Sequence, residues 1–448
     1  MATKALASWA VNLSYSSLPP EVVRAAVASF YNYAGCAIGG SNHPTATKAS
    51  TALAPFFGTS TSSILGSQGK QKADAQHAAL INGIACHIHD YDDTHLETII
   101  HPAGPVASAL FAYAEVKRPV NGKDFILALV AGIEAECKCG LAVWPAHYDI
   151  GWHITSTTGS IGAAVAVGKL LNLSVEQMQH AIGIAATQVT GLREMFGSDT
   201  KSFHPGRAAQ NGLLAAVLAS KEYTSSLTAL EAKRGWANVV DAKPHQLDKY
   251  MASLGKEWET AKNSFKPFPC GIVIHPVIDG CVQVRKDMQA AGANVEDIES
   301  IHAKVHHLVL ELTGKRTPKD GLEAKFSVYH GGAIGLVFGK GTPSQYDDSV
   351  VVDPKVTSVR DKMTATADES IRADETIIEV KMKDGKTFQK HITHAIGSLE
   401  VPLTEDLLQT KFLDQAELVI GAEGAKKASE RCWALESVDD VASIAEVL

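Results

Sequence analysis

The chain reads AALINGIACHI at residues 78–88 and DYDDTHLETIIHPAG at residues 90–104. The first segment is apolar and rich in small residues, so it is predicted to form a buried helix. The second segment places four carboxylates and two imidazoles within fifteen residues. Buried polar groups without partners cost free energy. The run at 90–104 is therefore either solvated or part of a functional site.

Three interpretations of this run remain open. In the functional one, Asp90 and His101 face a pocket as acid/base groups and Thr94 binds substrate. In the structural one, the Asp and Thr side chains form a solvated helix N-cap. The third is a metal site, because His87 and His89 would share one face of a strand. On a helix the same two residues point about 200° apart, so no metal site is expected.

Flanking segments extend the helical pattern over residues 1–260. Pro19-Pro20-Glu21 and Gly39-Gly40 have the composition of a helix start and a helix stop. Ser174 and Gln177 have the spacing of a capping box. Further Ala-rich helices are predicted at 107–117, 124–143, 159–171 and 207–220.

The pattern changes after residue 260. Alternating apolar residues predict a strand at 297–311, and two more at 375–392 joined by Asp384-Gly385, which favours a hairpin turn. Residues 325–340 are predicted to form a helix. We therefore expect a mainly α protein with two domains. Helical residues 1–264 and 402–448, from both chain ends, form the larger domain, and residues 265–401 form a smaller inserted α+β domain.

Composition excludes several classes of protein. The chain has 448 residues, 41 basic and 49 acidic, with a formal net charge of -8, and so lacks the basic stripe that nucleic acid requires. Its apolar runs fall short of the roughly 18 residues of a membrane span. The N-terminus makes a poor signal peptide. Seven scattered cysteines in apolar surroundings suggest reduced thiols. A cytoplasmic location is expected, with a mitochondrial one left open.

Two further segments carry candidate site residues in the helical part. In GWHITSTTGS (151–160), His153 precedes a helix whose N-terminal N–H groups can bind carboxylates. The alternative is that the hydroxyls only cap the helix. In FGSDTKSFHPGRAAQNG (196–212), Lys201, His204 and Arg207 lie ahead of a helix and suit a polyanionic small molecule. The alternative there is a solvated basic loop.

The smaller domain contributes two candidate segments. Lys266 and His275 flank a Pro/Gly turn at the expected domain boundary, a common place for a binding cleft. Tyr329 and His330 begin a predicted helix. The alternatives are a rigid connection and a core Tyr with a satisfied hydroxyl. The chain contains no P-loop, no dinucleotide-binding glycine motif after a strand and no G-x-S-x-G motif, which leaves nucleotide binding and serine hydrolysis without support.

Taken together, and in their order along the chain, the candidate segments described above resemble the sequence motifs of the MmgE/PrpD family. The matching motifs are DYDDTH with HPAG, GWHITSTTG, DTKSFHPGRAAQNG, KPFPCG with His275, and GSLEVPLT ahead of Lys411-Phe412. The family includes 2-methylcitrate dehydratase, cis-aconitate decarboxylase and iminodisuccinate epimerase. The resemblance implies a homodimer with the two domains described above and no metal or organic cofactor.

The decarboxylase pattern of that family would place the site on Asp90, Thr94, His101, His153 and Lys201. Where the pattern ends an S-x-Q-Y run with Tyr, this chain has Ser327-Val-Tyr329-His330. This departure puts decarboxylation of cis-aconitate in doubt, and the K-F-S-x-Y-H form is closer to the epimerase branch.

Four functions therefore remain as hypotheses. The first is a cofactor-independent lyase, a dehydratase or decarboxylase, acting on a small di- or tricarboxylic acid. The second is an epimerase of a dicarboxylate, and the others are a metal-dependent hydrolase and a catalytically silent binding protein. In the lyase, cations stabilise an enolate-like species next to a carboxylate. We expect His101, His153, Asp90 and Lys201 to be catalytic, and the smaller domain to close over the site. The expected substrate-binding residues are Thr94, His204, Arg207, Lys266, His275, Tyr329 and His330.

Overall fold

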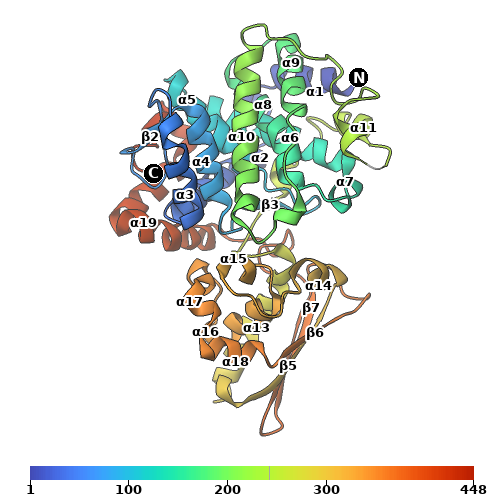
Figure 1. Cartoon of the computed structure of the whole chain (residues 1–448), viewed down its shortest axis with the longest axis vertical. Coiled ribbons are helices and arrows are strands. Elements are labelled where there is room, and N and C mark those ends of the chain that lie inside the picture. Colours follow the sequence, from blue (N-terminus) through green and yellow to red (C-terminus); the bar gives the residue numbers. More distant parts are fainter. Residues whose placement is uncertain (242) are drawn as a thin grey trace. The chain divides into compact units, whose positions relative to one another are not determined.

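The computed structural model describes residues 1–241 and 243–448, which fall into two compact units (Figure 1). Unit 1 contains residues 1–88, 92–264 and 405–448, and unit 2 contains residues 89–91 and 265–404. Unit 1 is built of helices with a few short strands, and unit 2 combines helices with one four-stranded sheet. The predicted mainly α fold with a smaller α+β part is confirmed.

Helix α8 (Ile154–Leu170) lies at the centre of unit 1. Every residue of this helix except Lys169 is buried, because Gly, Ala, Ser, Thr and Val side chains let neighbouring helices approach from all sides. The helices that pack against it are α5 (Ala103–Lys117), α6 (Gly122–Val143), α9 (Val175–Ala186) and α10 (Asp199–Ala219). Ser174 caps α9 through the predicted capping box with Gln177.

Two glycines bring helix α4 (Ala75–His87) close to α10. A Cβ atom on Gly83 would lie 2.5 Å from Cα of Gly206, and one on Gly206 would lie 2.3 Å from the carbonyl oxygen of Leu80. Neither position can therefore carry a side chain without moving the two backbones apart. This close approach places the end of α4 next to the first turns of α10.

The C-terminal helix α19 (Glu405–Trp433) packs on the N-terminal helix α2 (Pro20–Ser41). The ring of Tyr31 stacks on Trp433 with centroids 4.1 Å apart, and its hydroxyl lies 2.7 Å from Oγ of Ser429. Helix α19 is interrupted at Gly421, whose φ of 73° lies in the left-handed region. Both chain ends thus contribute to the same unit.

Shorter elements complete unit 1. The strands β1 and β2 pair antiparallel, and the seven cysteines, all among the described residues, are buried and form no disulfide. Among the described residues, no helix has the length and apolar character needed to cross a membrane. The shorter elements up to residue 265 are α1 (Ala2–Asn12), α3 (Pro44–Leu53), β1 (Ser62–Ser63), β2 (Lys72–Ala73), β3 (Asp93–His95), α7 (Ala146–Asp149), α11 (Trp236–Val240), α12 (Leu247–Met251) and β4 (Asn263–Phe265).

The sheet of unit 2 has the strand order β6-β5-β7-β8. β5 (Ile298–Val305) pairs parallel with β6 (Met363–Ala367) and antiparallel with β7 (Thr376–Met382), which pairs with β8 (Thr387–Ile392). The hairpin predicted at Asp384-Gly385 is confirmed. Helix α13 (His275–Ala290) packs on β7 and β8, and the predicted helix α16 (Val328–Phe338) packs on α13. The remaining helices are α14 (His307–Thr313), α15 (Gly321–Ala324), α17 (Asp348–Val351) and α18 (Pro354–Arg360).

Several element boundaries differ from the prediction, and three of them affect the site or the sheet. The strand predicted over 297–311 ends at Val305, because the His306 side chain accepts a hydrogen bond from the N–H of Leu308 and caps α14. Helix α8 begins at residue 154, not 159, and α10 at residue 199, not 207. In both cases residues that favour loops occupy the first helical turns, and α10 even contains a proline. Lys201 and His204 therefore lie on α10 and not ahead of it.

Candidate active site

Four buried imidazoles form a row inside unit 1. His87 ends α4, His101 precedes α5, His153 is the N-cap of α8 and His204 lies on α10. The ring centroids are 4.8 Å apart for His87 and His101, 5.8 Å for His87 and His153, and 5.2 Å for His153 and His204. None of the four residues is more than 4% exposed. The helices of unit 1 thus bring four sequence segments to one place.

The carboxylate of Asp92 bridges two members of this row. Its Oδ2 lies 2.8 Å from Nδ1 of His87, and its Oδ1 lies 3.2 Å from Nδ1 of His101. Burial alone would raise the pKa of Asp92, but the two neighbouring histidines hold it well below its usual value. An ionised Asp92 can only accept hydrogen bonds. Nδ1 of His87 therefore carries the hydrogen that it donates to Asp92.

A tight hairpin between β3 and α5 sets the position of His101. The N–H of His95 donates to the carbonyl of Ile100 over 2.8 Å. Oγ1 of Thr94 lies 3.5 Å from Nδ1 of His101, at the limit of a hydrogen bond. The N–H of His101 donates to Oγ1 of Thr155 in the first turn of α8 over 3.2 Å. The predicted pair of Thr94 and His101 is thus anchored to the central helix.

His153 and His204 are held together in direct contact. Their Nδ1 atoms lie 2.9 Å apart, so one ring donates a hydrogen and the other accepts it. The N–H of His153 donates to the carbonyl of Gly191 over 3.0 Å. Gly191 has a φ of +100°, and a Cβ there would lie 2.1 Å from Oγ of Ser156. Only glycine fits this position, which closes the loop over the start of α8.

Lys201 supplies a positive charge beside these histidines. It lies in the first turn of α10, is 7% exposed, and its Nζ lies 5.5 Å from the ring centroid of Phe196. Burial lowers the pKa of His204 to about 4, and the charge of Lys201 lowers it as well. Burial also lowers the pKa of His153 well below its usual value, with His204 and Lys201 adding to the effect. The two histidines are therefore neutral at pH 7, and His153 does not have the near-neutral pKa of an ordinary histidine.

A second carboxyl, Asp93, lies next to Asp92 in the sequence. Both of its oxygens lie 3.2 Å from the N–H of Ala103, the first residue of α5. Burial and the charge of Asp92 raise the pKa of Asp93 to about 7. Neighbouring carboxyls in one low-dielectric site are thus driven to different protonation states, a pattern common at functional sites.

In unit 2, Asp90 and Lys266 form a buried ion pair. Nζ of Lys266 lies 2.9 Å from Oδ1 of Asp90 and donates to the carbonyl oxygens of Asp90 and Cys270 over 3.1 and 3.0 Å. Asp90 has a φ of 51°, a backbone conformation that Asp and Asn adopt more readily than most residues. Two of the predicted site residues are thus direct partners.

The other predicted residues of unit 2 lie on its helices. His275 begins α13, and its ring meets Phe268 edge-on at 5.5 Å. The guanidinium of Arg316 lies 4.5 Å from the ring centroid of Tyr329. Nε2 of His330 lies 3.0 Å from the carbonyl oxygen of Gln345, and His330 is fully buried.

The structure brings some of the predicted site residues together within each unit. Unit 1 brings together Thr94, His101, His153, Lys201 and His204. Arg207 lies further along α10, where its Nη1 is 2.5 Å from Oε1 of Gln210. Unit 2 pairs Asp90 with Lys266. Sequence reasoning missed His87 and Asp92 as site residues, although a histidine at the end of an apolar helix, followed by three aspartates, was a signal for them.

Some of these side chains have the spacing of metal ligands. One ligand atom each from His87, Asp92 and His101 lie within 4.8 Å of one another, as do atoms of His95, Glu97 and Glu259. Glu259 already has an ion-pair partner, since Nζ of Lys138 lies 2.5 Å from its Oε1. Asp374, His394 and Glu400 form a third such group in unit 2. The expectation that no catalytic metal binds stays a prediction.

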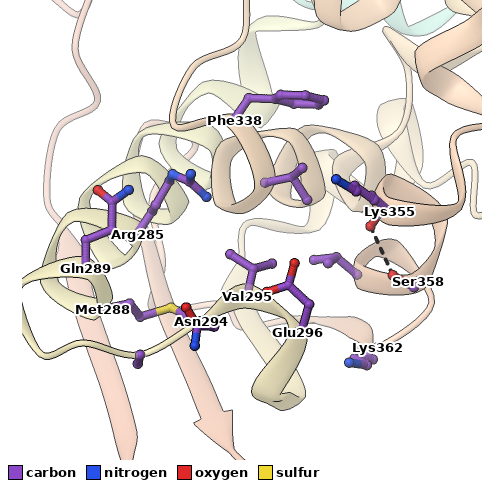
Figure 2. A pocket seen from close by; sticks show the side chains of 13 residues that line it. Arg285, Met288, Gln289, Asn294, Val295, Glu296, Phe338, Lys355, Ser358 and Lys362 are labelled. Carbon is purple, nitrogen blue, oxygen red and sulfur yellow. Dashed lines mark hydrogen bonds between the residues drawn. The ribbon is translucent and has the colours of Figure 1, made fainter.

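Unit 2 also contains a cavity of about 540 Å³ away from these residues (Figure 2). Arg285 on α13 and Lys355 on α18 point into it, above Met288 and Val295. None of the predicted site residues lines this cavity. The chemistry proposed below therefore rests on the histidine row of unit 1.

Fold and site together describe a helical protein with a smaller α+β unit and a buried, histidine-rich candidate site. Residues 4–247 match the MmgE/PrpD N-terminal domain and residues 268–435 match the MmgE/PrpD C-terminal domain. The chain belongs to the MmgE/PrpD family.

Named relatives of the chain include two decarboxylases and a dehydratase. The chain is 26% identical to a cis-aconitate decarboxylase of Aspergillus terreus, over 100% of this chain and 95% of that protein. It is also 26% identical to the human cis-aconitate decarboxylase, over 88% of this chain and 83% of that protein. Its identity to the 2-methylcitrate dehydratase of Escherichia coli is 23%, over 59% of this chain and 55% of that protein.

Proposed function

We propose that this protein is a lyase that acts on a small di- or tricarboxylic acid without a metal or organic cofactor. The observation that carries the proposal is the buried row of His101, His87, His153 and His204 next to Lys201. Buried imidazoles beside a fixed cation favour an anionic ligand, because the protein supplies positive charge and hydrogen-bond donors but little water. The relatives named above act on acids of this class.

The first requirement of the proposed reaction is to stabilise the negative charge that develops on the substrate. Removal of CO₂ or of a proton next to a carboxylate leaves an electron-rich, enolate-like species. Lys201 stabilises that species through its positive charge, and the N-terminal end of α8 adds the partial positive charge of a helix dipole. His101, oriented by Asp92, then moves a proton to or from carbon through Nε2. Such a proton transfer contributes typically about 10²–10⁴-fold to rate.

The residues of unit 2 belong to the proposal as substrate-binding groups. Lys266 is the strongest of them, because its charge is buried and fixed by Asp90. Replacing Lys266 by Ala removes an ion-pair partner of the buried Asp90, whereas replacing Lys319, an exposed lysine of the same unit, by Ala gives a matched loss of charge. We propose that only the replacement of Lys266 raises KM for the polycarboxylate.

We also propose that the protein is a homodimer and that it is located in the cytoplasm. Light scattering tests the first proposal, and cell fractionation tests the second.

One experiment separates the possible reactions. The purified protein is incubated in D₂O with cis-aconitate or with 2-methylcitrate, and the products are followed by NMR. Decarboxylation removes one carbon as CO₂ and places deuterium on the product, whereas dehydration gives a new alkene. Epimerisation exchanges one proton and leaves the formula unchanged. A protein that releases no CO₂, forms no alkene and only exchanges a proton is not the proposed lyase.

A further inference from the structure

His87 has one ring nitrogen bound and the other without a partner. Nδ1 lies 2.8 Å from Asp92, while Nε2 is buried and has no hydrogen-bond partner among the residues that the structure describes. The residue is 1% exposed. Buried polar atoms of native proteins are nearly always paired, so an exception requires an explanation. A ligand of the site provides one.

The surroundings of His87 indicate which kind of ligand. Within unit 1, the titratable groups that face it are Asp92 on the loop after α4, His101 before α5, His153 at the start of α8 and Lys201 on α10. Asp92 is the acidic member of this set, and both of its oxygens lie next to imidazole nitrogens. The charge of Lys201 and the neighbouring imidazoles of the same unit favour an anion over a cation at Nε2.

We propose that His87 is a further substrate-binding residue, whose Nε2–H donates a hydrogen bond to a carboxylate of the substrate. This inference rests on the proposed function, since the carboxylate belongs to the polycarboxylic acid of the same site. The bond requires a hydrogen on both ring nitrogens. Asp92 then balances the charge of the imidazolium, much as a carboxylate orients and stabilises a catalytic histidine.

Binding would therefore take up a proton from solution. Burial lowers the pKa of His87 to about 4, against the opposing effect of Asp92 and with Lys201 and His101 lowering it further. The free protein thus holds His87 neutral at pH 7. A carboxylate next to Nε2 favours the protonated form and raises this pKa. The proton comes from water, and no covalent bond of the substrate changes in this step.

Two replacements of His87 separate this role from a structural one. In His87→Asn the side-chain amide can still donate to Asp92 but does not reach the position of Nε2. In His87→Gln the longer side chain places an N–H donor near that position. We expect KM to rise about 10- to 100-fold in His87→Asn, the usual effect of losing a hydrogen bond to a charged group, and to recover substantially in His87→Gln. His180→Asn on α9, which removes another buried imidazole of unit 1, serves as the control and should leave KM unchanged.

Calorimetry of the full-length protein gives a readout independent of turnover. The probe is tricarballylate, a saturated tricarboxylate that has no hydroxyl to lose, titrated in phosphate and in Tris buffer at pH 7.5. The difference between the two heats reports the number of protons taken up. We expect the wild-type protein to take up about one proton more than His87→Gln, because only imidazole gains a proton on binding.

The outcomes are distinct. The inference is overturned if His87→Asn binds like the wild type with the same proton uptake. It is equally overturned if the Asn and Gln variants are impaired alike and both lose thermal stability, or if purified protein holds a stoichiometric metal on His87. Tricarballylate binding with His87-dependent proton uptake, but no turnover of any polycarboxylate, supports this inference and contradicts the proposed lyase function.

Discussion

His87 and Asp92 form a buried pair in which Nδ1 of the imidazole lies 2.8 Å from Oδ2 of the carboxylate. The other oxygen of Asp92 lies 3.2 Å from Nδ1 of His101, so one carboxylate contacts two imidazoles. The hydrogen bond to Asp92 leaves Nε2 of His87 as the nitrogen that can exchange a proton or meet a ligand. A five-residue separation in sequence is thus enough to build the central part of the site.

Replacing Asp92 by Asn should reduce kcat about 10²–10⁴-fold, because the amide nitrogen donates a hydrogen bond and can reverse the tautomer of His101. Steady-state kinetics with the preferred polycarboxylate measures this effect. Asp74→Asn, at the N-cap of α4 in the same unit, is the control for a lost carboxylate outside the row. Equal kcat values for the Asp92 variant and the wild type would contradict the assignment.

His101→Ala and His153→Ala should each lower kcat by orders of magnitude and change the circular dichroism spectrum little. Both side chains lie in the row, and each touches a second imidazole or the carboxylate that orients it. The comparison is made with His302→Ala, a replacement on strand β5 of unit 2. Near wild-type turnover in both site variants would rule out these residues as the acid/base groups.

Lys201→Ala should abolish most activity, and Lys201→Arg should recover little of it. Lysine presents a compact point charge in the first turn of α10, whereas the planar guanidinium of arginine needs a different geometry and more space. Lys221→Ala, after the end of the same helix, removes an exposed lysine and provides the control. Full activity in Lys201→Ala would show that this charge has no role in the reaction.

Chelator treatment should leave activity intact. The candidate ligands His87, Asp92 and His101 already form hydrogen bonds or ion pairs with one another, and Lys201 supplies positive charge without a metal. Elemental analysis of the purified, active protein and an assay after dialysis against EDTA provide the test. Stoichiometric zinc or iron that is lost together with activity would favour the metal-dependent hydrolase instead.

Local sequence signals predicted most of the elements that surround the site. Pro20 begins α2, Ser174 caps α9 and the turn at Asp384-Gly385 joins β7 to β8, as expected from short-range chemistry. The start of α10 was not predicted, because glycine, serine and proline before Arg207 indicate a loop when tertiary packing is unknown. Burial of this segment against α4 and α8 stabilises the helix there.

The site itself could be predicted only as a set of residue types. His153 and His204 are 51 positions apart and meet because α8 packs on α10, an arrangement that no motif encodes. His87 was considered only as a metal ligand, since its pairing with Asp92 depends on where α4 ends. The pKa of His153 also required the structure, because burial and neighbouring charges determine it.

The last prediction concerns the pH dependence of stability, and it uses a buried histidine outside the row. Nδ1 of His147 lies 2.8 Å from the carbonyl oxygen of Val240 and Nε2 lies 2.6 Å from Oγ1 of Thr157. Burial lowers the pKa of His147 from 6.5 to about 4, although the bond to Val240 opposes the shift. Between these two values the unfolded chain binds more protons than the folded one. Stability must therefore fall as the pH decreases from 6.5 towards 4.

Thermodynamic linkage gives the size of this loss of stability. The wild type is compared with His147→Gln, whose side-chain amide can keep polar contacts but does not titrate. Each such histidine contributes about 1.4 kcal/mol of unfolding free energy per pH unit. Asp93 acts in the opposite direction, since its folded pKa is raised to about 7, and comparing two proteins that both contain it removes this contribution. Urea unfolding at pH 7.5 and pH 5.0 should show the wild type losing about 2 kcal/mol more than the variant. Equal losses in the two proteins would mean that His147 is protonated in the folded state.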